Sequence, residues 1–243
     1  MRKRVVLVHG AVETGCGFAE VVRRLPNCEV VTYDRRGNGA AWATLPSDRG
    51  LDEHVVDLLD ALDDKPSVVV GHSLGGAVGL AAALRRPDLV QQLAMYETAL
   101  PAEDWWSARE RGAMMATISA NARHALSRSD LSQERRARLG AAWEACRRDV
   151  VALSAHRIPW RDLAVPLTVG VGTVNKGTSA RDARRLAKEL GADLVVLRGA
   201  GHSAHRTHPG LFAALVRRVV MQAAGEAPPL RHAGKREHSL EEL

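Results

Sequence analysis

Short apolar segments alternate along this chain with segments of helical periodicity, and no other feature constrains the fold as much. The expected strands are rich in β-branched residues and lie at residues 4–8, 29–33, 67–70, 93–96, 166–171 and 192–197. In the intervening segment 51–62, apolar residues recur at three- and four-residue spacing between acidic ones. Because strands that alternate with helices pair in parallel, the pattern predicts an α/β fold with helices on both faces of the sheet.

The strand pattern is interrupted once, and the interruption suggests how the chain is divided. From residue 101 to residue 160 no strand signal appears, and helical composition takes over. We therefore expect a core formed by residues 1–100 and 161–224, with a helical insertion at 101–160. Residues 225–243 contain Pro228, Pro229 and mixed charges but few apolar side chains, which predicts a flexible tail.

Charge and cysteine usage exclude several classes of function. The net charge is +6, but the basic residues form scattered pairs among acids, so we expect no nucleic-acid partner. No apolar stretch approaches the roughly 20 residues that span a bilayer, and the apolar run behind the basic start is too short for a signal peptide. A cytoplasmic protein without a membrane partner is predicted. The three cysteines lack metal-binding spacing, so neither disulfides nor a zinc site are expected.

The most informative motif runs from Gly71 through Ser73 to Gly75. An apolar strand precedes it, and an alanine-rich helix follows it. A serine at such a sharp strand-to-helix turn has its hydroxyl exposed, and small neighbours are required on either side. The amides at the start of the helix favour negative charge that develops nearby during acyl transfer. This context is typical of a nucleophile elbow.

Four motifs make the chain resemble small members of the α/β-hydrolase superfamily over residues 4–222. In the family's order they are Val8 to Ala11, Asp34 to Gly39, Gly71 to Gly76, and Gly199 to His202. The resemblance implies a three-layer α/β-hydrolase fold with a mostly parallel sheet of about six strands. It also implies that the family's first two strands are missing and that the insertion at 101–160 forms a lid.

A serine hydroxyl becomes a good nucleophile when a positioned base takes its proton, and histidine usually serves because its pKa lies near neutrality. Family order places this base after the last strand, where His202, His205 and His208 all lie. The resemblance implies His202, which directly follows the glycine-rich loop 199–201.

The other histidines near these motifs have structural interpretations. His208 precedes Pro209 at an expected helix start, so it is interpreted as a helix-entry residue. His9 is expected to shape the loop beneath Ser73, as the family uses His-Gly there. His72 is expected to be only the variable position of the elbow.

The acid that supports the histidine departs from the commonest family pattern. Many relatives carry an aspartate three residues after a glycine behind the penultimate strand, but here Gly172 leads to the uncharged Asn175. Asp182 falls in a segment that is predicted to be a surface helix and is a poor candidate. Glu97 ends the strand after the elbow, where some relatives supply the acid. We predict a triad of Ser73, Glu97 and His202. In the alternative interpretation, Glu97 is a polar strand-end residue at the rim of the active site without a catalytic role.

The resemblance also implies an oxyanion hole built from two backbone amides, those of Leu74 and Ala11. No cofactor or metal is needed for such chemistry. Trp105, Trp106 and Met95 are candidates for an apolar substrate pocket, although side chains of this kind are core residues as often as ligand contacts.

Together these inferences predict a serine hydrolase that cleaves a carboxylic ester, lactone or thioester of a small hydrophobic substrate through an acyl-enzyme on Ser73. A monomer or homodimer with a small-molecule substrate is expected. Carbon–carbon bond hydrolysis on the same scaffold is an alternative. Another alternative is a degenerate enzyme that binds a ligand without turnover. This alternative rests on the uncharged Asn175 at the position where many relatives carry the triad acid.

Overall fold

One seven-stranded sheet forms the centre of the computed structural model, which describes residues 2–47, 51–174, 178–225 and 238–240. Its strand order is β2-β1-β3-β4-β5-β6-β7, and all six pairings are parallel. The strands are β1 (Lys3–Val8), β2 (Cys28–Thr32), β3 (Ser67–His72), β4 (Val90–Tyr96), β5 (Leu167–Gly172), β6 (Asp193–Leu197) and β7 (His238–Leu240). The six predicted strands are all present, and the predicted α/β-hydrolase fold is confirmed.

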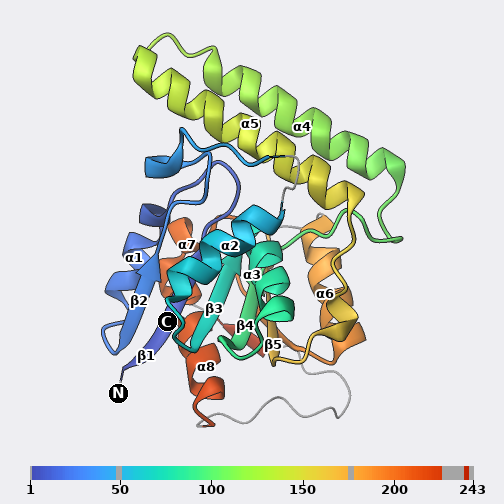
Figure 1. Cartoon of the computed structure of the whole chain (residues 1–243). Helices are drawn as coiled ribbons and strands as arrows, with labels where there is room; N and C mark the ends of the chain where they lie inside the picture. The colour runs from blue at the N-terminus through green and yellow to red at the C-terminus, as the bar shows by residue number, and fades with distance from the viewer. Residues whose placement is uncertain (1, 48–50, 175–177, 226–237, 241–243) are drawn as a thin grey trace.

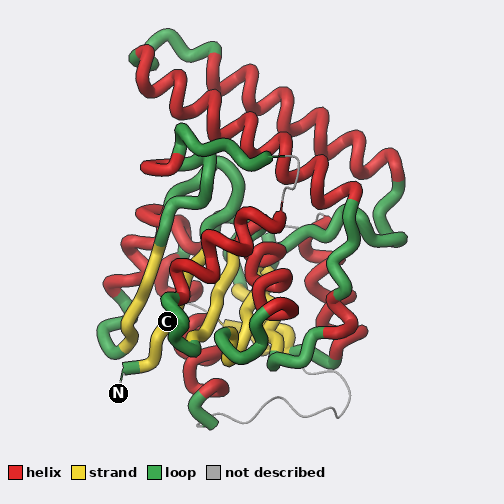
Figure 2. Tube along the Cα trace, viewed as in Figure 1, coloured by secondary structure: helices red, strands yellow, loops and turns green. Residues whose placement is uncertain are grey.

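Helices cover both faces of this sheet, which gives three layers (Figures 1 and 2). Side chains alternate across β1, so that Val6 and Val8 join one apolar core cluster while Val5 and Leu7 join the other. The first cluster includes residues of α2 (Leu51–Leu62), α3 (Leu74–Arg85) and α6 (Thr178–Leu190). The second includes residues of α1 (Ala19–Arg23), α7 (Ala204–Thr207) and α8 (Pro209–Ala223). Short 3-10 helices add η1 (Gly15–Phe18), η2 (Gly39–Ala41) and η3 (Trp160–Asp162).

The prediction of a flexible tail at 225–243 is wrong in one part. His238–Leu240 forms β7, which pairs with Val195–Leu197 of β6, and the Arg198 N–H donates to the Leu240 carbonyl at 2.9 Å. Leu240 also packs against the second core cluster. A three-residue strand carries too short an apolar pattern to be recognised in sequence. Gly225 follows α8, and the remainder of the predicted tail lies outside the described residues.

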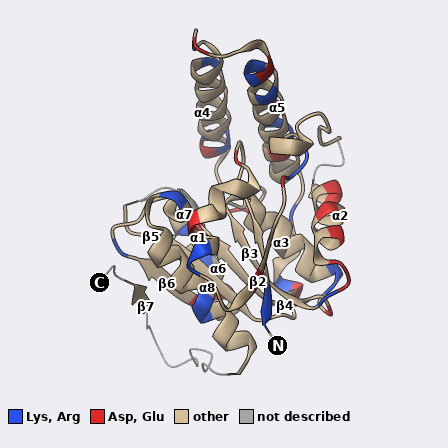
Figure 3. Cartoon of the chain, turned by 90° about the vertical axis from the view of Figure 1, so that its left-hand side faces the viewer, with Lys and Arg blue, Asp and Glu red and all other residues tan. Residues whose placement is uncertain are grey.

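The insertion at 101–160 contains two long helices, α4 (Ala108–Leu126) and α5 (Gln133–Ala155), which pack on each other. They form a hairpin that stands beyond the carboxyl ends of the strands (Figures 1 and 3). A capping box at Ser107 and Glu110 begins α4. No residue of α4 is fully buried, whereas the second half of α5 buries Cys146, Val150 and Leu153. The hairpin is therefore anchored through α5. In the described ranges, no helix is long and apolar enough to cross a membrane.

A buried charge cluster joins α5 to the loop after β2. The Arg35 guanidinium donates to Asp149 Oδ2 at 3.3 Å and to the Gly10 carbonyl at 2.9 Å, while His54 Nε2 contacts Asp149 Oδ1 at 2.8 Å. All three side chains are almost fully buried. Burial and then the Arg35 charge lower the pKa of His54. Asp149 is thus the carboxylate that compensates the buried Arg35 charge.

We expect Asp149→Asn to destabilise the protein by about 3–5 kcal/mol, because the substitution leaves the Arg35 charge buried without a counter-charge. Glu144→Gln is the matched control on the same helix. Glu144 pairs with Arg147 and Arg148 in partly exposed positions, and its loss is expected to cost about 1 kcal/mol or less. Urea unfolding of the two variants measures both effects. Equal losses would contradict the assignment of Asp149 as the essential partner of Arg35.

Candidate active site

Ser73 lies between the end of β3 and the start of α3 in a strained backbone conformation. Its φ of 52° and ψ of −121° lie outside the regions that L-residues normally adopt. Hydrogen bonds hold this conformation: the Ser73 N–H donates to the Tyr96 carbonyl at 2.9 Å, and Thr98 Oγ1 donates to the Ser73 carbonyl at 2.9 Å. The predicted strand–serine–helix turn is therefore present.

Two glycines around Ser73 are required by close backbone contacts. A Cβ atom at Gly71 would lie 2.4 Å from the backbone of Gly75. A Cβ atom at Gly75 would lie 2.2 Å from the Val8 carbonyl oxygen. Such distances leave no space for a side chain, so α3 packs directly against the ends of β1 and β3.

The structure brings Glu97 and His202 together. The His202 Nδ1 lies 2.9 Å from Glu97 Oε2, and the Gly172 N–H donates to Glu97 Oε1 at 3.0 Å. Glu97 is fully buried and has a φ of 47°, a second strained position next to the sheet, whereas the His202 side chain is 43% exposed. A carboxylate that accepts from Nδ1–H fixes the ring orientation and leaves Nε2 available as a base.

These groups lie at one end of the sheet. Ser73 follows β3, Glu97 follows β4 and His202 lies in the loop after β6. In open α/β sheets, ligands bind at the carboxyl ends of the strands. The hairpin of α4 and α5 stands beyond the same ends (Figure 3). The arrangement suits a reaction at this edge of the sheet.

The prediction that Asp182 lies on a surface helix is wrong. Asp182 is fully buried on α6, where its carboxylate accepts hydrogen bonds from the Leu100 N–H at 3.0 Å and from the indoles of Trp105 at 2.9 Å and Trp106 at 2.7 Å. The neighbouring arginines made the segment resemble a solvated face, but Ala180 and Ala183 turn it toward the core. Asp182 therefore anchors the start of the insertion. Asn175 lies outside the described residues.

The candidate pocket residues occupy packed positions. Met95 is fully buried in the first core cluster, and Trp106 is 2% exposed with its indole on Asp182. Trp105 is half-buried and packs edge-on against Trp160. Of the three, only Trp105 retains a partly exposed surface.

The two predicted oxyanion-hole residues lie on neighbouring strand ends. Leu74 is the first residue of α3, and Ala11 lies in the turn after β1, which pairs with β3 up to Val8 and Gly71. Nearby, the Arg35 N–H donates to His9 Nε2 at 2.9 Å, so His9 links the loop after β1 to the loop after β2. Burial and the Arg35 charge lower the pKa of His9 to about 3, so this ring stays neutral near pH 7.

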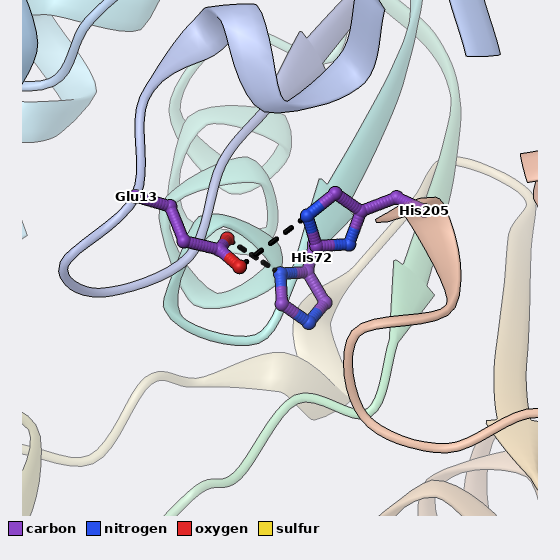
Figure 4. Close-up of side chains that lie close together, drawn as sticks. All are labelled: Glu13, His72 and His205. Atoms are coloured by element: carbon purple, nitrogen blue, oxygen red, sulfur yellow. Dashed lines mark hydrogen bonds and ion pairs between the residues drawn. The ribbon is translucent and has the colours of Figure 1, made fainter. Parts of the chain in front are cut away.

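Sequence reasoning missed a second group of polar residues beside Ser73. His72 is buried and is more than a variable position, because its ring contacts both Glu13 and the His202 carbonyl. Glu13 also pairs with the buried His205 (Figure 4). No motif spacing links these residues; only the fold brings them together. His208 occupies the position directly before α8, the helix-entry position predicted for it, and its side chain makes no capping hydrogen bond there.

A parallel sheet with a strained serine after its third strand and a histidine–carboxylate pair at the same edge defines a protein of the hydrolase type. The model of the alpha/beta hydrolase family matches residues 5–215, and the chain belongs to this family.

Similar structures and relatives agree with this assignment. NosK from Streptomyces actuosus is 25% identical with a TM-score of 0.72, and the match covers 92% of this chain and 100% of that one. The enol-lactonase from Burkholderia xenovorans LB400 is 24% identical with a TM-score of 0.70, over 91% of this chain and 92% of that one, and supports the fold. Lipase LipV from Mycobacterium tuberculosis is 36% identical over 98 residues, which are 40% of this chain and 38% of LipV. The chain thus matches less than half of LipV.

Proposed function

We propose that this chain is a serine hydrolase that cleaves a carboxylic ester, lactone or thioester of a small hydrophobic molecule through an acyl-enzyme on Ser73. The contact of 2.9 Å between His202 Nδ1 and the buried Glu97 carboxylate carries the proposal. A buried carboxylate of this kind orients a histidine and stabilises its cationic form, and a serine at a nucleophile elbow makes use of such a base.

In the proposed mechanism, Ser73 Oγ attacks the acyl carbon while His202 Nε2 takes the hydroxyl proton. Glu97 compensates the positive charge of the imidazolium, and the amides of Leu74 and Ala11 stabilise the oxyanion. His202 then gives the proton to the leaving alcohol or thiol, and the acyl–serine ester forms. Water attacks this ester with His202 again as base, which releases the acid and restores Ser73. The sequence of steps uses no cofactor or metal.

The names of similar proteins support hydrolysis at a carbonyl carbon. LipV is named a lipase. A protein named as a carbamate hydrolase, RutD from Agrobacterium fabrum, is 36% identical over 69 residues, which are 26% of its length. Both names describe cleavage of a bond to an acyl carbon. Because each match covers only a part of these proteins, neither name is carried over to this chain as its substrate.

A fluorophosphonate probe tests the proposal without knowledge of the substrate. We expect the folded protein to be labelled covalently, because the probe reacts with a serine whose proton a neighbouring base removes. Intact-mass and peptide analysis should locate the adduct at Ser73. Heat-denatured protein is the control and should stay unlabelled. A screen of p-nitrophenyl esters of increasing chain length, beside lactones and thioesters, would then define the acyl group.

A ligand-binding protein without turnover gives a different result. Such a protein has no chemical need for an activated nucleophile, so its Ser73 would remain unlabelled in folded protein. That outcome would contradict the proposed hydrolase activity.

A further inference from the structure

Three titratable side chains, the partly buried Glu13 and the buried His72 and His205, form a cluster beside the catalytic groups proposed above. His72 ends β3, His205 lies on α7 and Glu13 lies in the loop after β1. Glu13 Oε2 is 2.9 Å from His72 Nδ1, and Glu13 Oε1 is 3.3 Å from His205 Nε2 (Figure 4). The two histidine side chains are at most 2% exposed, and that of Glu13 is 14% exposed. We call these three residues the Glu13 cluster.

The Glu13 cluster touches three loops of the proposed active site: those after β1 and β3 and the loop of His202. Glu13 Oε2 accepts the Gly10 N–H at 2.9 Å, next to the proposed oxyanion residue Ala11. His72 directly precedes Ser73. On its other side, His72 Nε2 lies 2.8 Å from the His202 carbonyl oxygen. The side chains of Glu13 and His72 therefore connect the loop that carries Ala11, the elbow that carries Ser73 and the loop that carries His202.

For both contacts of His72 to be hydrogen bonds, the pair of His72 and Glu13 must carry one additional proton. Both of its ring nitrogens face acceptors, the Glu13 carboxylate and the His202 carbonyl, and a neutral imidazole has only one N–H. The second proton sits on His72 or on Glu13, and in either case the pair carries no net charge. Among the contacts described for Glu13, no lysine or arginine takes part. An extra proton on the pair would compensate the charge of the Glu13 carboxylate.

The surroundings lower the pKa of both partners in this contact. Burial would raise the pKa of Glu13, but hydrogen bonds from His205 and His72 outweigh it and hold that pKa well below its usual range. Burial lowers the pKa of His72, and the Glu13 carboxylate opposes this shift. The other titratable groups that face His72 are His202, His205 and Tyr96, and of these Tyr96 donates to the Gly201 carbonyl.

We propose that Glu13 is a positioning residue for the hydrolysis proposed above: through the proton-carrying contact with His72 it holds the backbone of His202 and the Gly10 loop in a fixed arrangement around Ser73. The inference rests on the proposed function for its catalytic consequence. The contacts of the cluster exist independently of turnover.

A divalent metal ion is the competing occupant of such a cluster, because one carboxylate and two histidines are common metal ligands. Both histidine nitrogens point at the carboxylate oxygens. The contact of 2.9 Å at His72 is shorter than the separation of about 3.3 Å that tetrahedral zinc ligands at about 2.05 Å would have, whereas the contact of 3.3 Å at His205 equals that separation. The experiment below includes zinc for this reason.

Glu13→Gln is the most informative variant because it keeps the shape and removes the charge. A glutamine oxygen still accepts the Gly10 N–H, but the uncharged side chain no longer retains the extra proton. His72 then has one N–H for two acceptors and loses either its contact with position 13 or its contact with the His202 carbonyl. Glu20→Gln is the matched control, since Glu20 pairs with Arg23 and Arg24 on the exposed surface of α1.

For Glu13→Gln we expect kcat on a p-nitrophenyl ester to fall about 10- to 100-fold with little change in KM, because the bound substrate is unchanged and the base is misplaced. Glu20→Gln should match the wild type. In NMR spectra of wild-type protein with ¹⁵N-labelled histidine at pH 7, we expect two protected proton signals at the His72 ring. One is the proton shared with Glu13, and in Glu13→Gln we expect one of the two signals to disappear.

Three outcomes would overturn the proposal. The first is a wild-type His72 with a single ring proton signal, which is readable even if Glu13→Gln does not fold. The second is a Glu13→Gln enzyme that loses the shared proton yet keeps wild-type kcat. The third is a wild-type protein whose melting temperature rises with equimolar Zn²⁺ while that of His205→Gln does not, because a metal would then be the resident cation. Failure of the hydrolase proposal is recognised separately. In that case fluorophosphonate would leave Ser73 of the wild-type protein unlabelled, and this result does not depend on the NMR signals of His72.

Discussion

Ser73→Ala is expected to lower turnover by about 10⁶-fold and to leave the fold intact. The size follows from serine enzymes in which removal of the nucleophile costs as much as removal of the whole triad. Without Oγ no acyl-enzyme forms, and only binding and the oxyanion amides remain to accelerate hydrolysis. The fold should persist because the turn depends on Gly71 and Gly75, whose backbones touch their neighbours, and on main-chain hydrogen bonds of Ser73.

The measurement is the initial rate on the best ester found by screening, together with a thermal melt. Ser127→Ala is a suitable control, because that hydroxyl donates to the His124 carbonyl on the exposed end of α4, away from β3. It should keep full activity. Ester hydrolysis at the wild-type rate by folded Ser73→Ala would mean that another group performs the attack. Loss of the fold would instead mean that the hydroxyl has a structural role.

The sheet could be predicted because five of its first six strands are buried over most of their length, whereas the edge strand β2 is only partly buried and was recognised from its valines. Burial on both faces demands a run of apolar residues, and such runs are visible without a structure. The elbow could be predicted because its glycines and its serine lie in one short segment directly after an apolar strand, although the contact that requires Gly75 is with Val8 of β1. The predicted ends of the strands were less accurate. β3 extends past Val70 to His72, because Gly71 and His72 pair with β4 although neither carries a β-branched side chain.

Other parts of the site depend on contacts between distant segments. Glu13 and His72 are 59 residues apart, and neither stands in a motif that distinguishes it from an ordinary polar residue. Asp182 illustrates the same limit, since its charge suggested solvent, while its three N–H donors come from the chain around residues 100–106. The Glu97 and His202 candidates came from family resemblance. The structure brings those two side chains into contact, and their catalytic roles stay predictions.

Glu97→Gln is expected to lower turnover by about 10⁴-fold with a much smaller effect on stability. A glutamine cannot compensate the charge that His202 acquires, and the loss of that charge in a comparable triad has this magnitude. Geometry adds a second reason. Both carboxylate oxygens of Glu97 face donors, the Gly172 N–H and His202 Nδ1, so an NH₂ group at this position must oppose one of them. If it opposes Nδ1–H, the ring adopts the wrong tautomer or turns away from Ser73.

Kinetics and the rate of fluorophosphonate labelling measure this effect, since both require the base. Asn175→Asp is the companion variant, because it restores the acid at the place where many relatives carry it. If Glu97→Gln is nearly inactive and Asn175→Asp restores its activity, then an acid after either strand can support His202. If Glu97→Gln is nearly silent while Asn175→Asp raises activity strongly, Glu97 is only a residue at the rim of the site. If both substitutions are silent, Ser73 and His202 work without a carboxylate, and the proposed triad is wrong.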